Sequence, residues 1–192
     1  MACAVTPGIT VIVLIQNGLN IERPWFELFP MNIVLSGVSM IGSQEAEPGI
    51  INHTSRDILT VGAFRNSNID ASKEQRSAEE FVSIYSAGGK TSCELTSNVG
   101  WDRWRKLVYN ASINPLCAIT GLDSGSLRLT ESALSALIRP AMEEIVAAAA
   151  AAGHILPDDI IQTMIDEDPV EAEFVPSMLQ DVRKVSPDFL YP

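Results

Sequence analysis

A lysine and two asparagines stand four residues apart along one stretch of the chain. Lys106, Asn110 and Asn114 occupy positions i, i+4 and i+8 within residues 101–121, WDRWRKLVYNASINPLCAITG. In a helix this spacing stacks the three polar side chains on one side. An ammonium group beside two carboxamides could donate to a substrate oxygen and orient it, as in a small-molecule site. The alternative is a solvated stripe on an amphipathic helix, and the spacing alone leaves both interpretations open.

A second polar candidate, Asn17, follows an apolar and β-branched run. Residues 9–15, ITVIVLI, predict a strand buried on both faces, as strands of parallel sheets are. Residues 20–28, NIERPWFEL, predict a short helix capped by Asn20 or an earlier residue, with Pro24 in its first turns. This order of strand, loop and helix would place Asn17 at the carboxyl end of a parallel strand, where open α/β sheets bind ligands.

The remainder of the first half also predicts a sheet protein. A helix is expected over residues 73–87, ending at Gly88 and Gly89, and residues 41–49 are expected to form a loop. Two of the expected strands, 50–54 and 58–64, would extend the sheet in antiparallel fashion. The expected strands after the first are 32–40, 50–54, 58–64 and 93–97.

From residue 98 onward the pattern is helical. The first helix should end or kink at Pro115, and its core-facing positions are Trp104, Leu107, Val108 and Ala111. Further helices are expected from Thr130 as N-cap to Ala152, with a kink at Pro140, and over residues 156–165 and 176–182; the acidic stretch 166–173 should be a solvated loop.

The change of pattern near Ser97 predicts two domains, 1–97 and 98–192. The expected fold class is α/β plus all-α, with a Rossmann-type sheet domain followed by a helical domain. A cleft between two such parts is the expected place for a ligand.

Composition narrows the classes of partner. The 192 residues carry a formal net charge of −11, with a pI near 4.5, which argues against nucleic acid and anionic membrane. Three dispersed cysteines and two distant histidines, His53 and His154, form no metal-binding pattern, so no metal site is expected. No apolar run is long enough to span a bilayer, the amino terminus lacks the basic start of a signal peptide, and we expect a cytoplasmic protein.

Four motifs, in this order, resemble those of the ketopantoate reductases (2-dehydropantoate 2-reductases). They are VIVLIQNG, then GVSMIG with PGIINHT, then W-x-K-L-x-x-N-x-x-I-N-P-L-x-A-I-T-G, then PSMLQD. The resemblance implies an NADPH-dependent enzyme that reduces 2-dehydropantoate to pantoate in pantothenate biosynthesis. It also implies a Rossmann-type cofactor domain followed by a helical domain of the 6-phosphogluconate-dehydrogenase-like type.

The resemblance assigns roles to five residues at matching motif positions. Lys106 would be the catalytic group that polarises the ketone oxygen as negative charge develops on it. Asn110, Asn114 and Ser177 would bind the substrate, and Asn17 would bind the cofactor at its nicotinamide. The expected partners are a small-molecule 2-oxo acid and, in a homodimer, a second copy of the chain.

Two departures from the family pattern keep alternatives open. The glycine-rich GxGxxG turn that binds the cofactor pyrophosphate is absent, and the closing SPDFLYP lacks the glutamate that the family places there. The chain therefore resembles a family member truncated at both ends, with an incomplete sheet domain and an incomplete helical domain. One alternative is an inactive fragment or pseudoenzyme that acts only as an association module. Another is a reductase of a different 2-oxo acid.

Overall fold

The computed structural model describes residues 4–184; the closing segment 186–192, in which no element is expected, lies outside them. The chain forms two compact units, Met1–Arg103 and Trp104–Pro192. The division falls within a helix, α3 (Val99–Asn110), whose first residues belong to one unit and whose last residues belong to the other.

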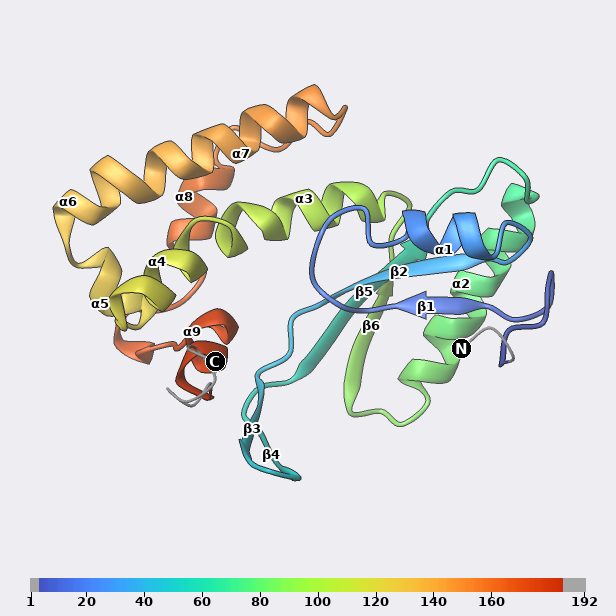
Figure 1. Ribbon diagram of the computed structural model, residues 1–192, viewed down its shortest axis with the longest axis horizontal. Helices are drawn as coiled ribbons and strands as arrows, with labels where there is room; N and C mark the ends of the chain where they lie inside the picture. Colours follow the sequence, from blue (N-terminus) through green and yellow to red (C-terminus); the bar gives the residue numbers. More distant parts are fainter. Residues whose placement is uncertain (1–3, 185–192) are drawn as a thin grey trace, which may run out of the picture. The chain divides into compact units, whose positions relative to one another are not determined.

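The first unit is built on a four-stranded mixed sheet (Figure 1). Its strand order is β1-β2-β5-β6, with β1 parallel to β2, β5 antiparallel to β2, and β6 parallel to β5. The expected strands over 9–15, 32–40, 58–64 and 93–97 are all present, although each is shorter or shifted by up to three residues. The strands are β1 (Ile12–Leu14), β2 (Val34–Ser39), β5 (Asp57–Ala63) and β6 (Thr91–Leu95).

Two helices cover the two faces of this sheet. Helix α1 (Arg23–Leu28) brings Trp25 and Phe26 against the core around Leu14. Helix α2 (Ala71–Ser86) packs on the other face, where its Ala78 is fully buried against Leu35, Leu59 and Val61. The burial of strand side chains between two apolar layers explains why β1 is apolar throughout and why β2 is buried over almost its whole length.

The segment before β5 differs from the expectation. Residues 43–47, expected within a loop, form strand β3 (Ser43–Glu47), which pairs with β4 (Ile50–His53) in a separate two-stranded sheet. The predicted addition of 50–54 to the main sheet was therefore wrong. Pro48 and Gly49 make the turn of this hairpin, with Gly49 at a φ of 80°, and every residue of both strands is exposed.

The second unit is helical, and the fold class expected from the sequence is thus confirmed. A run of helices follows the end of α3, as Figure 1 shows. They are α4 (Ile113–Thr120), α5 (Ser124–Arg128), α6 (Glu131–Ala133), the π-helical turn η2 (Leu134–Ile138), α7 (Arg139–Ala151), α8 (Ile160–Ile165), the 3₁₀ turn η3 (Val170–Ala172) and α9 (Ser177–Lys184).

The first helix of the second half ends earlier than expected. Helix α3 stops at Asn110, and α4 restarts at Ile113, so the break precedes Pro115. Pro115 lies in the first turn of α4, where a missing N–H has no intrahelical acceptor to lose. Because Ala111 lies in the connecting turn, it is exposed, and its predicted core position was wrong.

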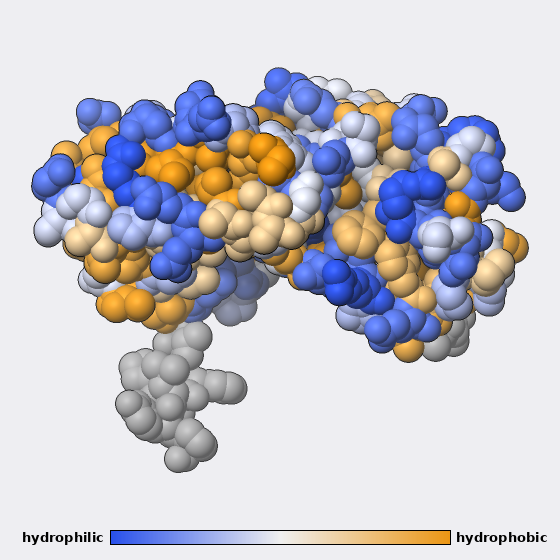
Figure 2. Space-filling view, turned by 90° about the horizontal axis from the view of Figure 1, so that it is seen from above, coloured by the Kyte–Doolittle hydropathy of each residue, from blue (hydrophilic) through white to orange (hydrophobic). Residues whose placement is uncertain are grey.

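The alanine-rich helix of the second unit is α7 (Arg139–Ala151), and part of its apolar surface is exposed. A π-helical turn immediately precedes α7, which has Pro140, the position of the expected kink, in its first turn. Within this turn Ile138 is fully buried, whereas its neighbour Leu137 is 52% exposed. Figure 2 shows apolar side chains gathered over the part of the helical unit that contains α6 and α7.

Candidate functional site

Lys106, Asn110 and Asn114 remain grouped in spite of the break between α3 and α4. Lys106 and Asn110 lie one turn apart in α3, and both side chains are half-buried. Asn114 lies in the first turn of α4 and is only 5% exposed. Its Nδ2 donates to Oδ1 of Asn110 at 3.3 Å. The two carboxamides are therefore in contact, as the i, i+4 spacing predicts, although they belong to different helices.

The buried carboxamide of Asn114 has an acceptor that the protein does not use. Its Oδ1 is buried and has no hydrogen-bond partner within residues 4–184. A buried polar atom without a partner is uncommon and destabilising in the unliganded protein. Such an acceptor suits a ligand that donates a hydrogen bond, for example through a hydroxyl group.

Ser177 is the first residue of α9, and it is exposed. Helix α9 packs against α4, the helix that carries Asn114. Leu179 anchors this contact because it is only 1% exposed, while Arg183 donates through Nη2 to the carbonyl oxygen of Gly121 at 2.9 Å. The second unit thus fixes the helix of Ser177 to the helix of Asn114.

Asn17 lies in the loop that follows β1, and its side chain is exposed. Because β1 is parallel to β2, this loop stands at the carboxyl end of a parallel strand, as the sequence predicts. Gly18 has a φ of 117°, a value that L-residues rarely adopt, so the turn after Asn17 requires glycine. The helix that follows has Glu22 at its N-cap position rather than Asn20 or an earlier residue.

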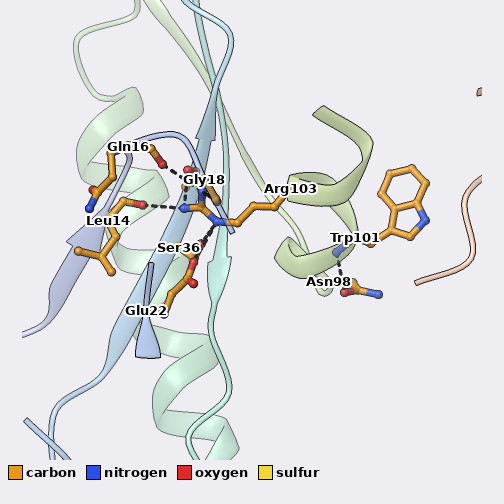
Figure 3. Close-up of polar contacts among 9 residues, drawn as sticks. Leu14, Gln16, Gly18, Glu22, Ser36, Asn98, Trp101 and Arg103 are labelled. Carbon is orange, nitrogen blue, oxygen red and sulfur yellow. Dashed lines mark hydrogen bonds and ion pairs between the residues drawn. The ribbon is translucent and has the colours of Figure 1, made fainter. Parts of the chain in front are cut away.

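The backbone on both sides of Asn17 is held by an arginine of α3 that sequence reasoning missed (Figure 3). Nη1 of Arg103 donates to the carbonyl oxygens of Gln16 at 3.0 Å and Gly18 at 2.9 Å. Its Nη2 donates to the carbonyl oxygens of Leu14 at 3.3 Å and Gly37 at 3.2 Å. One guanidinium group therefore joins the end of β1, strand β2 and the Asn17 loop.

A buried carboxylate completes this cluster. Nε of Arg103 lies 2.9 Å from Oε1 of Glu22 and donates to Oγ of Ser36 at 2.7 Å, while Ser36 donates to the same carboxylate oxygen at 2.6 Å. Glu22 is fully buried and Arg103 is 6% exposed. Burial lowers the pKa of the Arg103 guanidinium, whereas the Glu22 carboxylate opposes that shift. Arg103, Glu22, Ser36 and the four carbonyl oxygens are called the Arg103 cluster below.

A second buried arginine organises the helical unit. Arg128 donates through Nε to the carbonyl oxygen of Ser124 at 3.0 Å, and through Nη2 to that of Asp168 at 2.8 Å. Its Nη1 donates to the carbonyl oxygen of Ile165. The side chain of Asp168 accepts from the hydroxyl of Tyr109 at 2.7 Å. The acidic stretch 166–173, expected to be a solvated loop, is therefore attached to the core through Asp168.

Within residues 4–184, no group of three or more histidine, cysteine, aspartate or glutamate side chains could hold a metal ion. In the same range, no helix is both long and apolar enough to cross a bilayer.

Two family profiles match separate parts of the chain. Residues 2–66 match "Ketopantoate reductase PanE/ApbA", and residues 98–187 match "Ketopantoate reductase PanE/ApbA C terminal". The second match covers all of Lys106, Asn110, Asn114 and Ser177, and the first covers Asn17.

Individual proteins are similar over most of the chain. An uncharacterised protein of Saccharomyces cerevisiae is 38% identical over 185 residues, which are 91% of this chain and 50% of that protein. A solved 2-dehydropantoate 2-reductase from Methylococcus capsulatus is 32% identical, with a TM-score of 0.77, over 93% of this chain and 55% of that one. A D-mandelate dehydrogenase shares the fold, with a TM-score of 0.81 at 22% identity, over 94% and 57% of the two chains. The chain spans about half the length of the curated relatives it matches.

Proposed function

Because this chain belongs to the ketopantoate reductase family, we propose that it carries the substrate side of an NADPH-dependent reductase that converts 2-dehydropantoate to pantoate. The observation that carries the proposal is the contact between Asn110 and Asn114, one turn from Lys106, together with the unused buried acceptor of Asn114. A solvated stripe would not contain a carboxamide that is only 5% exposed.

Lys106 is the proposed catalytic residue. Reduction of a 2-oxo acid places negative charge on the ketone oxygen, and an ammonium donor stabilises that charge as it develops. The same ammonium group can pass a proton to the oxygen, so that the product is a hydroxyl group. Lys106 is half-buried in α3, and an ionic interaction is stronger where water is partly excluded.

The remaining polar residues of the helical unit are proposed to orient the substrate. Oδ1 of Asn114 is suited to accept from the hydroxyl group of 2-dehydropantoate, because it is an acceptor already removed from water. Asn110 holds the Asn114 carboxamide in place through its Oδ1. Ser177, exposed at the start of α9, is the proposed donor to the substrate carboxylate.

Asn17 is the residue proposed to hold the nicotinamide of NADPH. Its exposed carboxamide, at the carboxyl end of a parallel strand, fits the amide of that ring. When bound, the cofactor would supply the hydride to the ketone carbon. A second copy of the chain is also a proposed partner, and the apolar surface over α7 is the candidate contact for it.

The test is an assay of NADPH oxidation by the chain in the presence of 2-dehydropantoate. The loss of NADPH absorbance measures the rate. Lys106→Ala should lower kcat by about 10²–10⁴-fold, since a positioned proton donor contributes about that factor. Lys90→Ala, which removes an exposed lysine of the first unit, should leave the rate unchanged.

Other outcomes would select the alternatives. Equal rates for the Lys106→Ala variant and the unmutated chain would remove the assignment of Lys106. Higher kcat/KM for a different 2-oxo acid in a substrate panel would change the substrate and keep the chemistry. If calorimetric titration shows no NADPH binding and no substrate is reduced, the chain acts as a non-catalytic association module.

A further inference from the structure

Every donor of the Arg103 side chain is already in use. A guanidinium group has five N–H donors in a planar fork and no acceptor. Here Nε serves Ser36 and Glu22, Nη1 serves two carbonyl oxygens, and Nη2 serves two more. Arg103 therefore has no donor left for a substrate carboxylate or a cofactor phosphate. Its contribution to any site must act through the groups that it holds.

The groups it holds are concentrated around one proposed site residue. Two of the four carbonyl acceptors belong to Gln16 and Gly18, the immediate neighbours of Asn17 in the chain. The bonds to Leu14 and Gly37 attach the same guanidinium group to the end of β1 and to the middle of β2. The peptide unit between Gln16 and Asn17 and the one that follows Gly18 are thus both attached, through Arg103, to the strands of the sheet.

The carboxylate of Glu22 fixes the orientation of the fork. Its Oε1 pairs with Nε of Arg103, while Oγ of Ser36 accepts from Nε and donates to Oε1. Glu22 also stands at the N-cap of α1, although its side chain makes no capping bond there. Oε1 of the carboxylate is therefore engaged by Arg103 and Ser36, and the start of α1 is attached to the same point.

We propose that Arg103 is a positioning residue that fixes the Asn17 loop, residues 15–20, and so presents the Asn17 carboxamide in one orientation. A lysine cannot replace it, because an ammonium group has three donors and cannot bond four carbonyl oxygens and the Ser36 hydroxyl at the same time. The consequence for the nicotinamide contact rests on the function proposed above. The effect on the loop does not.

Hydrogen–deuterium exchange of the full chain tests the effect on the loop. Arg103→Lys keeps a cation beside Glu22 but loses the fork, so backbone amides of residues 15–20 should exchange at least about tenfold faster, as in a locally opened loop. Amides of α2 should be unaffected. The matched control is Arg65→Lys, which alters another arginine paired with a fully buried carboxylate, Glu74, in the same unit. That variant should not change exchange in the loop.

Chemical rescue provides a second readout that a general loss of stability would not reproduce. Arg103→Ala leaves a space of guanidinium shape between Glu22 and the carbonyl oxygens. Guanidinium ion at a concentration below that which perturbs the unmutated chain should restore protection of the loop in this variant. Unchanged loop exchange in Arg103→Lys would overturn the proposal. So would faster exchange spread evenly over the first unit, because that pattern marks a stability role alone.

Kinetics then separate this proposal from the proposed function. If the chain reduces 2-dehydropantoate, Arg103→Lys should raise the KM for NADPH about tenfold and leave the KM for the 2-oxo acid within twofold, because Lys106, Asn110 and Asn114 are untouched. An equal rise in both KM values would contradict the role through Asn17. A chain without reductase activity would remove the proposed function, while the exchange experiment would still decide whether Arg103 fixes the loop.

Discussion

The two units each contain one buried arginine that bonds backbone carbonyl oxygens, but only one of these arginines has a carboxylate partner. Arg103 pairs with Glu22 and adds four carbonyl acceptors. Arg128 bonds three carbonyl oxygens, and within the described residues it forms no ion pair. Arg128 lies in the last turn of α5, where the free carbonyl groups of a helix end favour a cation.

The two arginines differ in the source of the negative charge that stabilises each guanidinium group. For Arg128, the carbonyl oxygens within α5, at the end of α8 and at Asp168 supply enough partial negative charge. The bonds to them join three backbone segments. The end of a strand has no comparable dipole. A full carboxylate is therefore present where an arginine must hold an exposed loop, and the loop is the one that carries Asn17.

Removal of the Arg103 cation should produce the largest effect. Arg103→Met leaves Glu22 buried without its counter-charge, which should lower the free energy of unfolding by about 3–5 kcal/mol. Urea denaturation followed by circular dichroism measures it. The double variant Arg103→Met with Glu22→Leu should recover part of the loss, because it removes the unpaired charge as well. No recovery would show that the carbonyl bonds, and not the ion pair, dominate.

Arg128→Met should cost less. It leaves three carbonyl oxygens without a donor, but it leaves no buried carboxylate without a counter-charge. We therefore expect the free energy of unfolding to fall by about 1–3 kcal/mol in the same urea experiment. A loss equal to or larger than that of Arg103→Met would contradict the distinction drawn between the two arginines.

Replacement of a hydrogen-bonded tyrosine by phenylalanine in each unit should have the smallest effect on stability. The pair of variants compares the two units at alkaline pH. Tyr85 donates to Asp57 at 2.6 Å in the first unit, and Tyr109 donates to Asp168 at 2.7 Å in the second. The hydrogen bond to Asp57, with burial, raises the pKa of Tyr85 from 10.0 to about 12. Burial, followed by the bond to Asp168, raises the pKa of Tyr109.

The pKa of the Tyr85 hydroxyl is higher in the folded than in the unfolded chain. The hydrogen bond of this hydroxyl therefore contributes its full stabilisation below pH 10, and that contribution is lost as the pH rises toward 12. Each Tyr→Phe variant should lose about 1 kcal/mol at neutral pH, and its stability should fall less steeply than that of the unmutated chain across this alkaline window. The loss should be larger for Tyr109, which is 9% exposed, than for the half-buried Tyr85. Melting temperatures measured across the window provide the comparison, and an unchanged slope would contradict it.

Local patterns predicted most of the elements because each rests on residues close in sequence. The apolar run before Asn17, the Gly88–Gly89 stop and the helical spacing after Asn98 each describe one segment, and the structure has the expected type of element at each. Strand β4 was expected over 50–54, but its partner β3 was not predicted, because its exposed residues carry no apolar alternation.

The candidate site shows the same limit. The spacing of Lys106, Asn110 and Asn114 correctly indicated that the two carboxamides meet, although the helix break between them was not foreseen. Arg103 was missed because its partners come from β1, β2 and the Asn17 loop, and no local pattern contains them. The available indication was an arginine four residues before the predicted core position Leu107, since a charge at such a position needs a partner.

The sequence separation within the Arg103 cluster has a consequence for the order of folding. Its donor bonds join residues 66 to 89 positions apart. During synthesis, β1 and β2 leave the ribosome long before α3 exists, and closing so large a loop is entropically costly. The turn around Asn17 therefore reaches its final geometry only when α3 docks. It should be among the last parts of the first unit to mature, and a nascent chain arrested before α3 would hold the sheet without the finished turn.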